Sequence, residues 1–165
     1  MLLSDSESKT VWQRVYDTLH FKPSINSDVI PFKLDVPYVI FDISSINHEV
    51  IDSKISEILV ECTLENEYLY ALDWQHSNFK FNPRNKDEQQ DTYVTDDRYF
   101  GGGYNAYFPS FYPDGDYYFF LASDFRFGYL GHPWQNKIWI FGEKLIEAIK
   151  KNAQLLGFNI LEEVN

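Results

Sequence analysis

The run from 116 to 122 (DYYFFLA) constrains the fold most strongly, because both of its alternating faces are apolar. Side chains alternate across a strand, so Tyr117, Phe119 and Leu121 point one way and the residues between them point the other way. A strand that is apolar on both faces must be covered on both sides. This run therefore predicts a central sheet strand with a packed layer above it and another below it.

Two neighbouring runs predict further strands of the same sheet. Residues 125–130 alternate aromatic and smaller side chains, and residues 137–141 (KIWIF) are again apolar on both faces. Ser123 and Asp124 separate the first two runs, which predicts a tight hairpin. Pro133 lacks a backbone donor and so ends the second strand, whereas a Pro-Asp-Gly turn at 113–115 introduces the first.

Three amphipathic segments predict helices around this sheet. Ser4 and Glu7 have the spacing of a capping box before a helix, Asn47 can cap a second helix, and Gly157 suits the end of a third over 143–156. Further strands are expected over residues 38–43, 68–74 and 79–81, with a last edge strand at 158–161. Residues 82–103 are polar and acidic and end in three glycines, which predicts a mobile loop.

Length and pattern together predict one globular domain over residues 1–165. We expect an α+β fold in which a mainly antiparallel, aromatic-rich sheet of about five or six strands is packed by about three helices. Nothing in the sequence predicts an internal repeat or a second domain.

Charge and composition limit the partners that this chain can have. The net charge is −11, from 25 acidic and 14 basic residues, which disfavours nucleic acid and suits a basic protein partner. Solubility is the simpler explanation of the same charge. The one cysteine, Cys62, cannot form an internal disulfide, and we find neither a signal peptide nor an apolar run long enough for the membrane. These features predict a cytoplasmic protein.

Polar side chains at the ends of the predicted strands are the candidate site. His132 could act as a base or a ligand if Asp73, Asp114 or Asp116 oriented its second nitrogen. The candidate pocket comprises Asp73, Trp74, His76, Asp114, Asp116, Arg126, His132 and Trp134. The competing interpretation is structural: a histidine that caps a turn, carboxylates that bind backbone at strand ends, and an arginine paired with a nearby aspartate.

Known catalytic and cofactor signatures do not occur in the sequence. The four histidines lie far apart, and neither a paired cysteine nor a His-Glu-x-x-His motif is found, so we expect no metal and no cofactor. Ser110 and Ser123 lack a nucleophile elbow, and the glycines at 101–103 match neither phosphate-binding motif. Whether the protein is an enzyme stays open.

Several of these motifs together resemble a known bacterial family. The segments LDWQHSNFKFNP, FPSFYPDGDYYFFLASDFRFGYLGHPW and IWIFGEKLI lie within about residues 67–147 and are similar to a domain-of-unknown-function family, DUF 2716. The resemblance implies no activity, since none is established for that family.

Two functions remain as hypotheses. The first is an acidic protein-interaction module, of which an immunity-type inhibitor of a basic toxin would be one form; it is favoured by the acidic composition and by the lack of a catalytic signature. The second is a small-ligand-binding or catalytic domain with the pocket named above. It requires that those side chains converge.

Overall fold

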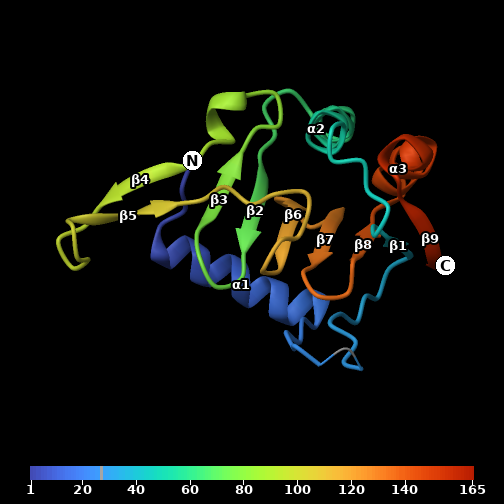
Figure 1. Ribbon diagram of the computed structural model, residues 1–165, viewed down its shortest axis with the longest axis horizontal. Coiled ribbons are helices and arrows are strands. Elements are labelled where there is room, and N and C mark those ends of the chain that lie inside the picture. The colour runs from blue at the N-terminus through green and yellow to red at the C-terminus, as the bar shows by residue number, and fades with distance from the viewer. Residues whose placement is uncertain (27) are drawn as a thin grey trace.

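An antiparallel sheet forms the centre of the computed structural model, which describes residues 1–26 and 28–165 (Figure 1). Seven described strands make this sheet in the order β3-β2-β6-β7-β8-β1-β9. Their bounds are β1 Tyr38–Asp42, β2 Leu69–Asp73, β3 Asn78–Phe81, β6 Tyr118–Ala122, β7 Gly128–His132, β8 Lys137–Phe141 and β9 Asn159–Val164. The predicted α+β fold is confirmed. The sheet has more strands than the five or six expected, and its edge beside β1 is β9, where the last edge strand was predicted.

Helices cover both faces of this sheet. Helix α1 (Asp5–Leu19) crosses one face, and helices α2 (Ile51–Glu61) and α3 (Glu143–Leu156) cover the other (Figure 1). The central strand β6 is buried from both sides: Phe119 and Leu121 pack in the cluster under α1, and Phe120 packs in the cluster under α2 and α3. The prediction from residues 116–122 of a strand covered on both faces is therefore confirmed.

Local signals set the ends of the helices. The Ser4 hydroxyl accepts a hydrogen bond from the Glu7 backbone N–H at 3.2 Å, and the Glu7 carboxylate accepts from the Ser4 N–H at 2.9 Å, which completes the predicted capping box. Gly157 ends α3 at φ 74°, where an added Cβ would lie 2.0 Å from a backbone oxygen. Asn47 does not cap α2. Its side chain closes the preceding turn by accepting from the Glu49 N–H at 3.2 Å.

One strand begins later than predicted. The expected strand at 125–130 is β7, Gly128–His132, because Phe125 adopts φ 60° in the turn after β6. A left-handed backbone cannot continue a strand, so the pairing resumes only beyond this turn. Among the described residues, no helix combines the length and the apolar character needed to cross a membrane.

Residues 82–103 are not a structureless loop. They contain a 3-10 helix at Lys86–Glu88, the strand β4 (Thr92–Thr95) and the first residue of β5 (Gly103–Ala106). Strands β4 and β5 pair with each other in a separate two-stranded sheet that projects from the body of the molecule (Figure 1). We call residues 91–107 the aromatic arm. The sequence did not reveal this hairpin because its strands are only four residues long and β4 is largely exposed.

Candidate functional site

Two carboxylates meet where strand β2 ends and strand β6 begins. Asp73 is the last residue of β2 and pairs with Tyr118, so Asp116 lies just beyond the same edge. Side-chain alternation gives Asp73 the parity of Leu69 and Ala71, which pack under α2. Asp116 has the parity of Phe120 on the neighbouring strand, so both carboxylates lie on the same face of the sheet.

The turn after β2 brings His76 back to these two carboxylates. His76 Nδ1 lies 3.0 Å from Asp73 Oδ1 and 3.2 Å from Asp116 Oδ2. One ligand atom from each of the three residues can be chosen so that all three atoms lie within 4.8 Å of one another. We call Asp73, His76 and Asp116 the carboxylate–imidazole cluster. Both aspartates are buried, whereas the side chain of His76 is 64% exposed, so the cluster is reached from solvent past the imidazole.

Backbone and side-chain bonds hold this cluster in place. The Gln75 N–H donates to Asp73 Oδ1 and to Asp116 Oδ2, each at 3.3 Å. The Tyr117 N–H donates to Asp116 Oδ1 at 2.7 Å. Asn78 Oδ1 accepts from the Asp73 N–H and from Trp12 Nε1 of α1, both at 3.1 Å. Asn78 therefore links the backbone of Asp73 to the first helix, whereas Asp116 is positioned by backbone N–H groups at the strand ends.

The proton equilibria of the cluster are shifted. Burial raises the pKa of Asp73 to about 7, and the neighbouring Asp116 carboxyl adds to the effect. The hydrogen bond to Asp73 raises the pKa of His76, and burial opposes this only in part. Near neutral pH the Asp73 carboxyl is thus partly protonated, and a cation placed between the two carboxylates would favour their ionised form.

These shifts predict how stability depends on pH. A carboxyl group whose pKa is raised on folding binds more protons in the folded state, so its contribution to stability falls as pH rises between about 4 and 7. Asp73→Asn removes this pH dependence. In metal-free protein we therefore expect the unfolding free energy of the variant, relative to that of wild type, to be about 1–2 kcal/mol higher at pH 8 than at pH 5. Urea denaturation at each pH measures the difference.

The comparison of wild type with Asp73→Asn removes the contribution of His132, which changes stability with pH in the opposite direction. Burial lowers the pKa of His132 to about 4, so this group makes the fold more stable as pH rises between about 4 and 6.5. It does so equally in wild type and variant, and it therefore cancels. The raised pKa of His76 changes stability in the same direction as that of Asp73. The stabilisation that a protonated His76 provides is lost as pH rises through the pKa that this group has in the folded protein. A difference that stays constant from pH 5 to pH 8 would contradict the raised pKa of Asp73.

The aromatic members of the predicted pocket form a second cluster on the opposite face of the sheet. Tyr117 follows Asp116 in the chain and points toward the face that α1 covers. Its ring centroid lies 4.8 Å from that of His132, 5.5 Å from Trp134 and 5.9 Å from Trp74. His132 is buried; its Nδ1 accepts from the Trp134 N–H at 3.2 Å, and its Nε2 lies 3.2 Å from the Tyr117 hydroxyl.

The other two predicted residues lie apart from both clusters. Asp114 is exposed, and its backbone oxygen accepts from the Tyr118 hydroxyl at 3.1 Å. Arg126 lies near the opposite end of β6, beyond Ala122, where it pairs with Glu67 and with Asp124. The single pocket that we predicted from sequence is therefore divided by the sheet. Adjacent residues of a strand point to opposite faces, and the ends of β6 are separated by its length.

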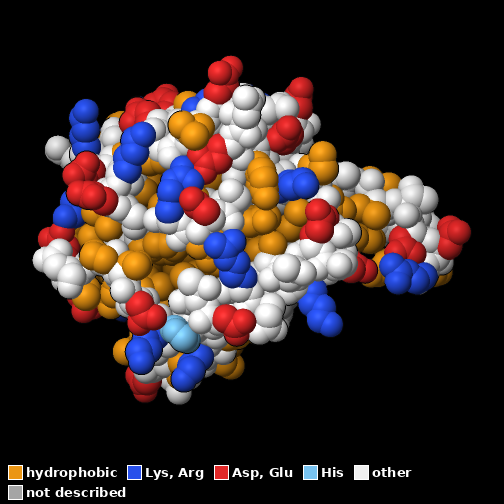
Figure 2. All heavy atoms as spheres, turned by 180° about the vertical axis from the view of Figure 1, so that it is seen from behind, with side chains coloured by type: hydrophobic (Ala, Val, Ile, Leu, Met, Phe, Trp, Pro, Cys, Tyr) orange, Lys and Arg blue, Asp and Glu red, His pale blue; other side chains and the backbone are white. Residues whose placement is uncertain are grey.

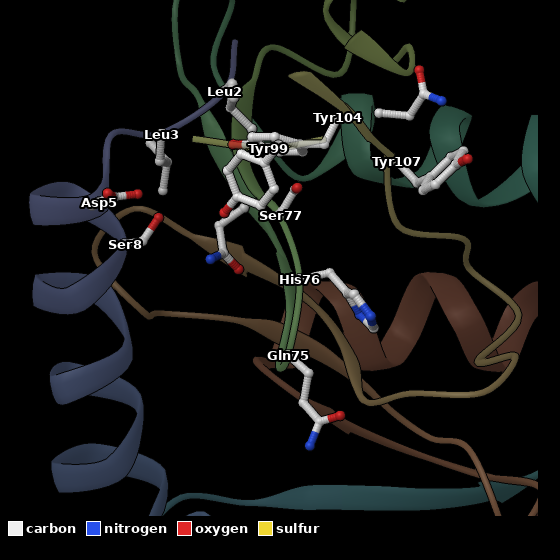
Figure 3. A pocket seen from close by; sticks show the side chains of 12 residues that line it. Leu2, Leu3, Asp5, Ser8, Gln75, His76, Ser77, Tyr99, Tyr104 and Tyr107 are labelled. Carbon is white, nitrogen blue, oxygen red and sulfur yellow. The ribbon is translucent and has the colours of Figure 1, made fainter. Parts of the chain in front are cut away.

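A cavity of about 500 Å³ opens beside His76 (Figure 3). His76 is the one cluster residue in its lining. Its lining also includes three tyrosines of the aromatic arm, Tyr99, Tyr104 and Tyr107, and the start of the chain at Leu2 and Leu3 (Figure 3). The aromatic arm thus borders the cavity through which solvent reaches the His76 imidazole.

The cluster offers the ligands of a divalent metal site. One imidazole nitrogen and two carboxylate oxygens suit Zn²⁺ and Mn²⁺. The sequence search for paired histidines overlooked this set, because it combines Asp73-x-x-His76 on one turn with Asp116 from a different strand. An aspartate at the end of each of two pairing strands was the signal that could have revealed it.

Comparisons with known proteins place the chain among uncharacterised proteins. The family model described as "Protein of unknown function (DUF2716)" matches residues 2–146. The uncharacterized protein YxiI of Bacillus subtilis (strain 168) is 32% identical over 173 residues, which cover 95% of this chain and 96% of that protein. No solved structure gives a significant match.

Proposed function

The chain belongs to the DUF2716 family, and from this premise we propose that it is a small-ligand-binding domain in which Asp73, His76 and Asp116 bind a divalent metal ion. The observation that carries this proposal is the buried pair of carboxylates joined to one exposed imidazole. Buried charges in proteins are paired or coordinate metals, because an uncompensated one costs several kcal/mol.

A divalent metal can take the place of the proton that balances this charge in its absence. In the metal-free protein the raised pKa of Asp73 keeps a proton on the carboxylate pair up to about neutral pH, and a bound cation displaces it. A divalent cation neutralises both carboxylates and binds the neutral imidazole. Three protein ligands leave coordination positions open, which is the arrangement of metal sites that also bind water or a substrate. The cavity beside His76 provides space for such a ligand.

Calorimetric titration of the chelator-treated protein with ZnCl₂ tests this proposal. We expect one ion per chain, and at a free concentration of 100 times the Kd we expect about 2.7 kcal/mol of added stability. His76→Gln should weaken this binding by about 100-fold or more, whereas His48→Gln should not change it, since His48 packs against Tyr112 instead. An undetectable heat for wild type, or equal affinities for the two variants, would overturn the proposal.

A second candidate is an acidic protein-interaction module, for which an immunity-type inhibitor of a basic toxin is the specific form. The aromatic arm favours it, because exposed aromatic side chains gather there on a chain with a net charge of −11. This function predicts a complex with a basic protein that weakens as salt is added.

A further inference from the structure

We propose that the aromatic arm, residues 91–107, is the docking surface for a basic protein and that Phe100 is its anchor. This inference rests on the interaction function proposed above and is independent of metal binding. It names the surface and the chemistry of the partner: an apolar cavity that receives one aromatic ring, framed by lysine or arginine side chains.

Exposed rings are concentrated on this arm. The exposed fractions are 57% for Tyr93, 49% for Tyr99, 108% for Phe100 and 60% for Tyr107. Phe100 lies in the connection between the strands, so its ring contacts solvent on all sides. Figure 2 shows hydrophobic side chains along the projecting arm, with charged groups near its end. Clustered exposed aromatics of this kind mark protein interaction sites.

The arm is ordered by its own bonds. The Asp96 N–H donates to the Gly102 oxygen at 2.9 Å, and the Gly102 N–H donates back to the Tyr99 oxygen at 3.0 Å. Arg98 forms a fork with the Asp96 carboxylate, with Nη2 to Oδ2 at 2.6 Å. The connection that carries Phe100 is therefore fixed before a partner arrives, which lowers the entropy cost of binding.

Close packing on the strands adds to this order. The Tyr93 ring lies over Gly103, where an added Cβ would be 2.7 Å from the tyrosine hydroxyl and 2.2 Å from the Val94 oxygen. Only glycine allows this approach. At the base, Asp91 Oδ1 accepts from the Phe108 N–H at 2.8 Å. A two-stranded hairpin is only marginally stable by itself, so these bonds maintain an element that buries little apolar surface of its own.

The charges of the arm and of the whole chain define the partner. Asp91, Asp96 and Asp97 stand against Arg98 on the arm, and the chain has 25 acidic and 14 basic residues. Like charges oppose docking onto a second copy, whereas a basic partner is attracted and oriented by the same field. An aromatic ring buried at the centre of such an interface supplies a large share of the binding energy.

Site-specific crosslinking in the full-length chain tests the proposal. The photoreactive residue p-benzoylphenylalanine replaces Phe100 in one version and Leu64, which is 78% exposed on another part of the surface, in the matched control. Both versions are irradiated in cells of the organism that encodes the chain. Each captured protein is then purified and titrated with wild type, Phe100→Ala and Leu64→Ala at low and at raised salt.

The proposal predicts a basic protein crosslinked through position 100 and not through position 64. Its affinity should fall by about 30-fold or more in Phe100→Ala, stay unchanged in Leu64→Ala, and weaken as salt is added. A covalent dimer of this chain, an acidic partner, equal affinity for Phe100→Ala or no crosslink at position 100 would overturn it. A salt-sensitive basic partner captured only through position 64 would retain the interaction function and reject this surface. Capture through neither position would reject both.

Discussion

Replacing Tyr117 by alanine is expected to lower the free energy of unfolding by about 4–5 kcal/mol, the upper range for removing a large buried aromatic side chain. Tyr117 is fully buried and is among the largest side chains of the core. It contacts the rings of Phe21 on the segment after α1 and of His132 on β7, at centroid distances of 4.9 Å and 4.8 Å. The substitution leaves a cavity between these two elements, and the atoms that line it lose their packing contacts.

The hydroxyl group adds a separate contribution. It donates to the Ser24 oxygen at 2.9 Å and accepts from the Ser24 N–H at 3.1 Å. Tyr117→Phe removes these bonds and the contact with His132 Nε2 at 3.2 Å, and it should cost about 1–2 kcal/mol, because buried polar groups lose their partner. Tyr107→Ala, at a ring that is 60% exposed, is the control and should change stability by about 0.5 kcal/mol or less.

Urea denaturation of the three variants measures these values. A loss of less than about 2 kcal/mol for Tyr117→Ala would contradict the packing described here, since even a well-collapsed core site costs that much. A zero effect of Tyr117→Phe would mean that Ser24 finds other partners when the hydroxyl is removed.

Asp116→Asn is expected to reduce the affinity for Zn²⁺ by about 100-fold or more, which corresponds to about 2.7 kcal/mol. The asparagine oxygen can still accept from the Tyr117 N–H, and the Gln75 N–H keeps its other acceptor, Asp73 Oδ1, so the strand ends keep their positions. The variant loses one negative charge and one anionic ligand from the buried pair. The substitution therefore weakens metal binding and leaves the protein folded.

A neighbouring aspartate supplies the control for this variant. Asp114→Asn removes the same charge two residues away from an exposed side chain outside the cluster, and it should leave Zn²⁺ affinity within about 2-fold of wild type. Equal losses in the two variants would mean that general electrostatic attraction, and not coordination by Asp116, attracts the ion.

The core of the fold could be predicted from sequence because its central strands are strongly apolar on both faces. Residues 137–141 are apolar on both faces and form β8 with the expected bounds, and 143–156 form α3. Here hydrophobic periodicity and the signals at the element ends agree. The aromatic arm was not predicted, since four-residue strands rich in exposed side chains carry no alternation that distinguishes them from a loop.

The site could be predicted only in part for a geometrical reason. The sequence identified Asp73, His76 and Asp116 as strand-end residues, but it gave no means of separating them from His132 and Trp134. That separation depends on strand register: Asp73 pairs with Tyr118, and Tyr118 pairs with Gly131, so all of these residues share one edge while alternation divides them between two faces. Register between strands far apart in the chain is a tertiary property.

The state of His76 Nδ1 tests the proposed metal site most directly, because this atom lies within 3.2 Å of both carboxylates. Long-range ¹H–¹⁵N spectra report which ring nitrogen carries a proton or a metal. With one equivalent of Zn²⁺ we predict that Nδ1 of His76 shifts to a metal-bound position and no longer titrates, while His48 keeps its spectrum. A His76 that still titrates with the raised pKa of the metal-free protein would contradict the account.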